Sequence, residues 1–120
     1  MSMKKEDFDQ FVGMMEQEIR SEDSIYKGFI NISKFKTSCT YLKRTKCQGR
    51  YISTRIHVSE WIKEYMFEVR VIIRADGDRH KGVVPLDQNT LECHCIRHDV
   101  FAFMEVEQEA ISMAQKLGWL

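Results

Sequence analysis

The 120-residue chain carries 18 Lys and Arg against 18 Asp and Glu, so its formal net charge is zero at pH 7. This length fits a single domain spanning residues 1–120. The shares of hydrophobic (43%) and charged (30%) residues are those of a folded globular protein rather than a disordered one. Zero net charge weighs against a dedicated polyanion binder, whose domain is usually strongly basic.

The balanced total hides three blocks of unlike charge. Residues 1–25 hold three bases and seven acids, residues 26–58 hold eight bases and no acid, and residues 59–120 hold seven bases and eleven acids. The net charges of the blocks are therefore −4, +8 and −4. Because such asymmetry shapes the surface field rather than the fold, it predicts a basic surface held between acidic ends.

The amino-terminal residues predict a helix. Glu6, Asp7 and Asp9 lie in its expected first turn, where the helix dipole favours negative charge. The apolar residues that follow share one helical stripe: Phe8, Phe11, Val12, Met15 and Ile19.

Residues 25–35 suit a helix as well as a strand. We expect a short helix or irregular segment to about Ser33, and then a strand over residues 36–45. Cys47-Gln48-Gly49-Arg50 contains a turn signal, and residues 51–58 are expected to return as the partner strand. Ser59 is interpreted as a helix N-cap or a turn residue.

Residues 65–74 alternate strictly between apolar residues and residues that are mostly charged, which indicates a long strand with one buried face. Asp-Gly at 76–77 predicts a tight turn, residues 80–86 a returning strand, and residues 91–97 a further strand. The two carboxylates and the imidazole at 76–80 also suit a cation or acid–base chemistry, but a turn needs the same residues.

Residues 99–118 predict a final helix, with Asp99 as its N-cap and Gly118 at the position after its end. Residues 100–106 also alternate well enough to be a strand. Together the elements predict an α+β fold: an antiparallel meander sheet of about four strands with the N- and C-terminal helices packed on one face.

The amino terminus runs into acids rather than an apolar signal core, and no apolar run approaches the ~20 residues that cross a bilayer. We therefore expect a cytoplasmic protein that does not enter a membrane. Its four cysteines are then expected as reduced thiols. A Cys47–Cys93 or Cys39–Cys95 bridge is an alternative only in an oxidising compartment.

Cys93 and Cys95, followed by His98, form the most metal-like cluster. Zinc prefers such ligands, but the second cysteine pair of known structural zinc sites is missing. We therefore favour neither a metal nor any other cofactor. No recognised catalytic motif occurs. His57 with Glu60 and Glu64 would resemble a base and its orienting group, but the two glutamates share a helix face only if this stretch is helical. The sequence leans against an enzyme without excluding one.

The block without acids supplies the candidate binding residues. Bases with interleaved aromatic rings suit contacts with an acidic protein surface or with single-stranded nucleic acid. The candidates are Lys34, Lys36, Tyr41, Lys43, Arg44, Lys46, Arg50, Tyr51 and Arg55.

These features lead to three hypotheses about function. The first is a non-catalytic regulator, inhibitor or adaptor that docks on a larger protein through a charged surface. The second is direct nucleic-acid binding through the basic region 34–55. The third is a zinc-supported or hydrolytic domain. The sequence leaves the oligomeric state open.

Overall fold

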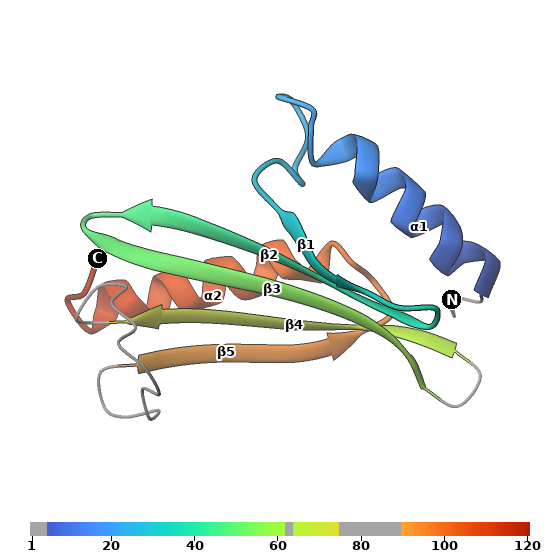
Figure 1. Cartoon of the computed structure of the whole chain (residues 1–120). Helices are drawn as coiled ribbons and strands as arrows, with labels where there is room; N and C mark the ends of the chain where they lie inside the picture. The colour runs from blue at the N-terminus through green and yellow to red at the C-terminus, as the bar shows by residue number, and fades with distance from the viewer. Residues whose placement is uncertain (1–4, 62–63, 75–89) are drawn as a thin grey trace.

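The computed structural model describes residues 5–61, 64–74 and 90–120. Along the chain, one helix precedes and one helix follows a five-stranded antiparallel meander, whose strand order is that of the sequence (Figure 1). The elements are α1 (Lys5–Glu18), β1 (Ile30–Lys34), β2 (Ser38–Cys47), β3 (Arg50–Trp61), β4 (Glu64–Arg74), β5 (Thr90–Arg97) and α2 (Ala102–Lys116). This confirms the α+β class and the meander, with five strands rather than about four.

The additional strand is β1, in the region that suited both helix and strand. It pairs with β2, and its register shifts between Asn31 and Ser33. The Asn31 side-chain amide donates to the backbone carbonyls of Ser33 (2.8 Å) and Thr40 (3.1 Å), which stabilises the irregular backbone. Because β1 is short and largely exposed, its sequence lacks the alternation that identifies a strand with one buried face.

A two-residue turn joins β2 to β3. Gln48 and Gly49 both have positive φ (51° and 83°), as a type I′ hairpin turn requires, and Cys47 pairs with Arg50 across it. The predicted turn is therefore confirmed. Ser59, however, is not a helix N-cap: it lies within β3, paired with Ser38 on one side and Met66 on the other.

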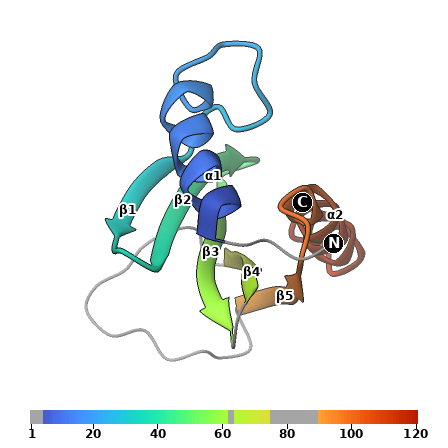
Figure 2. The same ribbon diagram turned by 90° about the vertical axis from the view of Figure 1, so that its right-hand side faces the viewer.

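Both helices pack on the same face of the sheet, here called the covered face (Figure 2). The ring of Phe8 on α1 stacks on the ring of Tyr65 of β4 with 4.5 Å between the ring centres, and Phe11 contacts Phe67 edge-on with 5.1 Å between the ring centres. Every second residue of β4 is buried against this layer, as its alternation predicted. The core therefore lies between the covered face and the two helices.

Helix α2 ends as predicted and begins later than predicted. The N–H groups of Gly118 and Trp119 donate to the carbonyls of Gln115 and Ala114, and Gly118 has φ of 78°, which is a Schellman motif. At the other end, the Asp99 carboxylate accepts the N–H of Phe101 at 2.9 Å, so it caps the turn before the helix.

The expected strand at 91–97 is confirmed by β5. The expected tight turn at 76–77 and the expected strand at 80–86 lie outside the described residues. No helix in the described part of the chain is long and apolar enough to span a membrane.

Candidate binding face of the sheet

The open face is the sheet face opposite the two helices, and neither helix covers it (Figure 2). Since neighbouring side chains of a strand alternate between faces, the buried residues of β3 and β4 identify which residues point outward. The main open-face residues are Leu42, Arg44 and Lys46 of β2; Tyr51, Ser53, Arg55 and His57 of β3; Met66, Glu68, Arg70 and Ile72 of β4; and Glu92, His94 and Ile96 of β5.

Two arginines meet in the middle of this face. Arg55 on β3 and Arg70 on β4 are direct partners in the ladder. Leu42 and His94 continue the same row on the outer sides, so the row carries two permanent cations and one titratable imidazole. Like charges directly opposite one another destabilise a sheet. The pair therefore has no evident role in stability.

Further cations lie beside this row at the β2–β3 hairpin. Tyr51 is opposite Lys46, whose ammonium lies 5.8 Å from the centre of the Tyr51 ring, and the Arg44 guanidinium lies 4.9 Å from it. The open-face residues of β2 and β3 include no acid. We refer to Arg44, Lys46, Arg55 and Arg70 as the cationic cluster.

The β4–β5 half of the open face has mixed charge. Arg70 lies 3.3 Å from the carboxylate of Glu92, and Glu68 lies 3.3 Å from the His94 ring. The cluster is therefore partly neutralised on the β4–β5 side, while the described open-face residues of β2 and β3 supply no carboxylate. Among the described residues, positive charge is thus concentrated toward the β2–β3 hairpin.

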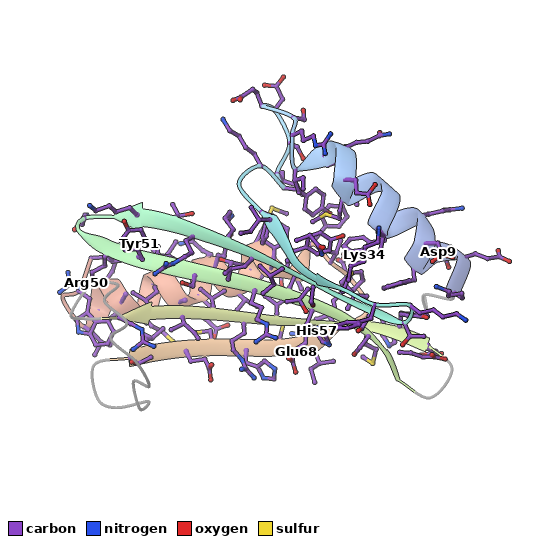
Figure 3. All side chains as sticks on the ribbon, viewed as in Figure 1. Asp9, Lys34, Arg50, Tyr51, His57 and Glu68 are labelled. Atoms are coloured by element: carbon purple, nitrogen blue, oxygen red, sulfur yellow. The ribbon has the colours of Figure 1, made fainter. Side chains whose placement is uncertain are left out.

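His57 lies between the two halves, opposite Glu68 (Figure 3). Its Nδ1 is 2.7 Å from the hydroxyl of Thr40 on β2. Burial is the main cause that holds the pKa of His57 below its ordinary value, and the charge of Arg55 adds to it, while Glu68 opposes both. Near neutral pH, His57 is therefore an uncharged member of this face.

Two of the predicted binding residues lie in the covered layer instead. Tyr41 is only 1% exposed and belongs to the core. The Lys43 ammonium lies 3.0 Å from the Glu107 carboxylate of α2 and 4.9 Å from the centre of the Phe29 ring. Glu107 also accepts the Thr54 hydroxyl. Lys43 is thus part of an internal polar network.

Three further predicted residues lie away from the open face. Arg50 donates to the carbonyl of Trp119, near the end of the chain. Lys34 (Figure 3) pairs with Glu16 of α1 at 2.8 Å. Lys36 is exposed, and its backbone carbonyl accepts a hydrogen bond from the Lys5 ammonium at the start of α1. Of the nine predicted residues, the structure brings together only Arg44, Lys46, Tyr51 and Arg55.

Arg70 belongs to the same cluster but was not among the predicted residues, because it lies outside the basic block of the sequence. A usable signal was present: Arg70 is one of the charged residues on the strand with strict alternation. Assigning that charged face to the same side as Arg55 requires the register between β3 and β4, which the sequence does not give.

A groove of about 390 Å³ separates α1 from the end of β1. Phe8, Val12 and Phe35 contribute its apolar wall, and Gly13 opens it by lacking a side chain. The charges on its rim are largely satisfied within the protein, because Lys5 pairs with Asp9 and Lys34 with Glu16. The groove thus offers shape but little unpaired charge.

The cysteine cluster does not form a ligand set. Cys93 and Cys95 are on the covered face of β5, and the Cys93 thiol donates to the Met113 sulfur at 3.7 Å. Burial raises the pKa of both thiols. Within residues 5–61, 64–74 and 90–120, no three potential ligands gather around one point. The candidate residues at 76–80 lie outside the described residues.

Comparison with protein-family models, curated proteins and solved structures finds no match to this chain. The function of the protein is therefore inferred from the geometry and charge of the open face.

Proposed function

We propose that the protein is a non-catalytic binding domain that docks on an acidic surface of a larger protein through the open face of its sheet. The placement of Arg55 directly opposite Arg70, with Arg44 and Lys46 beside them, supports this proposal. A bound carboxylate that reaches both arginines would relieve their repulsion and form charge-assisted hydrogen bonds. Complementary charge would also speed the encounter and favour one orientation.

A protein fits the open face better than a nucleic acid. Nonpolar Leu42 and Ile72 are interspersed with the cations, which suits a mixed protein surface. Single-stranded nucleic acid is usually held by several stacking rings. Of the two tyrosines predicted for that role, Tyr41 is buried, which leaves Tyr51. Because Arg44 and Lys46 flank Tyr51, nucleic-acid binding remains the second candidate.

Matched charge-removal variants test the proposal. The triple variant Arg44→Ala/Lys46→Ala/Arg55→Ala removes three cations from the open face. The control Arg20→Ala/Lys27→Ala/Lys116→Ala removes three exposed cations from elsewhere. Proteins retained from a cell extract by the wild type are identified and purified, and each is then titrated calorimetrically against all three forms.

We expect the open-face variant to lose about tenfold or more in affinity, which is about 1.4 kcal/mol or more. The control is expected to bind like the wild type, and added salt should weaken wild-type binding most. Equal binding by both variants would contradict the proposal. A gel shift with single-stranded RNA that only the open-face variant loses would favour the second candidate.

A further inference from the structure

The two edges of the sheet differ in how open they are to another strand. At one edge, β1 has five residues, an irregular register and a lysine, which are devices that discourage further pairing. At the other edge, β5 has eight residues in an uninterrupted register with β4, from Phe67–Arg97 to Arg74–Thr90. In the described part of the chain, no strand pairs with the outer side of β5. Its outward N–H and C=O groups therefore form a template for an extended chain.

An acidic flank of α2 runs beside this edge. Glu105, Glu109 and Met113 are spaced by four residues, so they lie along one side of the helix. The Met113 sulfur accepts the Cys93 thiol of β5, and the charges of Glu105 and Glu109 raise the pKa of the Cys95 thiol. Both glutamates are exposed, and neither forms an ion pair with another described residue. The flank therefore places two exposed carboxylates beside β5, and neither has an ion-pair partner among the described residues.

We propose that the edge of β5 binds an extended basic peptide segment as a sixth strand, with two of its Lys or Arg side chains paired with Glu105 and Glu109. Main-chain hydrogen bonds to β5 would supply affinity, and the carboxylates would select the sequence, as in other cases of strand addition. The acidic flank belongs to a helix on the covered side of the sheet, away from the cationic cluster, so strand addition at β5 does not depend on the proposed function.

The spacings of helix and strand match at this place. A rise of about 1.5 Å per helical residue puts four-residue neighbours about 6 Å apart along α2. Alternate residues of a strand are about 6.7 Å apart and point to the same side. Since α2 runs back along the direction of β5 (Figure 1), a Lys-x-Lys sequence in the added strand would present both ammonium groups to Glu105 and Glu109.

A second copy of this chain is a less suitable occupant. Symmetric pairing of two β5 edges would bring the acidic flanks of both α2 helices toward the same seam. Like charges facing one another oppose association. A basic segment from a different protein meets no such repulsion.

The test uses a blocked nine-residue peptide of alternating valine and lysine, and the same peptide with glutamate in place of lysine. Amide hydrogen exchange and chemical-shift mapping by NMR follow the wild type, Glu105→Gln/Glu109→Gln, and the control Glu6→Gln/Asp23→Asn. The control acids are exposed and lie on α1 and in the following turn. The open-face triple variant provides a fourth arm, because it should bind the lysine peptide unchanged whatever becomes of the proposed function.

We expect the lysine peptide to protect alternate amides of β5, and the glutamate peptide to leave them unprotected. The Glu105→Gln/Glu109→Gln variant is expected to bind the lysine peptide about tenfold more weakly with an unchanged fold. The proposal is overturned if those amides are already protected in the free protein, if both peptides bind alike, or if protection maps to β1. Dimerisation of the free protein through β5 would also overturn it.

Discussion

Arg55 and Arg70 are direct cross-strand partners on the open face, where two fixed positive charges oppose each other. If the pair is kept for binding, then removing one charge should stabilise the free protein. We expect Arg55→Thr to raise the free energy of unfolding by about 0.2–1 kcal/mol, because threonine also suits a strand. Urea titration measures this change.

Arg44→Thr is the matched control for that change. Arg44 is on the same face but opposite Ser53, so its removal relieves no direct like-charge pair. We expect its effect on stability to be smaller than that of Arg55→Thr. A lower free energy of unfolding for Arg55→Thr than for the wild type would show that the arginine pair stabilises the sheet.

The Lys43–Glu107 pair gives the opposite expectation. Both side chains are less than one-fifth exposed (17% and 18%), and Glu107 also accepts the Thr54 hydroxyl. Truncation of Lys43 leaves the largely buried Glu107 carboxylate without its cation. We expect Lys43→Ala to lower the free energy of unfolding by about 2 kcal/mol.

Lys46→Ala is the control, because Lys46 is an exposed neighbour on the other face. Its effect on stability should stay within about 0.5 kcal/mol. In a double-mutant cycle, Lys43→Ala should cost much less when Glu107→Leu is already present. Additive effects of the two changes would contradict a coupled pair.

The fold was predictable wherever one face of an element is buried and the other exposed. β4 and both helices have this property, and the positive-φ turn before Arg50 was marked by Gly49. β1 was missed because both of its isoleucines are exposed, so burial imposes no alternation on it. Local sequence also suggested that Ser59 is a helix N-cap or a turn residue, but pairing with β2 and β4 keeps it in a strand.

The candidate site was less predictable, because it depends on which strands are neighbours. Lys43 was grouped with the other bases. It is on the same strand face as Tyr41, however, and because Tyr41 is buried in the core, Lys43 also points to the covered side. Arg70 joins the cluster only through the register between β3 and β4. Charge counted along the chain thus placed several cations of the cluster on the β2–β3 hairpin, but it did not show that Lys43 faces the covered side.

His57 should make stability depend on pH. Burial, and then Arg55, hold its pKa below the ordinary value of 6.5, so the folded protein binds the proton more weakly than the unfolded chain. The stability that the neutral His57 ring contributes is therefore fully present above about pH 6.5. It is lost as the pH drops from there toward the pKa of His57 in the folded protein. We expect the urea concentration at the unfolding midpoint to be lower at pH 5.5 than at pH 7.5.

His57→Gln should remove this component, since glutamine does not titrate. His98→Gln is the control, because His98 is exposed on the segment after β5. Glu68, which is opposite His57 in the ladder, and its partner His94 are retained in both variants. If His57→Gln loses as much stability as the wild type on acidification, another group is responsible.

The four thiols should react with iodoacetamide in an order set by burial and charge. Cys47, half-buried beside the β2–β3 turn, is expected to react first at pH 8. Cys39 is fully buried, and burial raises its pKa to about 11, so it should react only when the protein unfolds. Timed labelling followed by peptide mass spectrometry gives the order.

Cys95 also reports on the acidic flank of α2. Burial raises its pKa most; the charges of Glu105 and Glu109 raise it further, and that of Arg97 lowers it. Glu105→Gln/Glu109→Gln should therefore increase the thiolate fraction of Cys95 and speed its labelling, while the rate at Cys47 stays unchanged. An unchanged rate at Cys95 would place the two carboxylates too far from β5 to select a strand bound there.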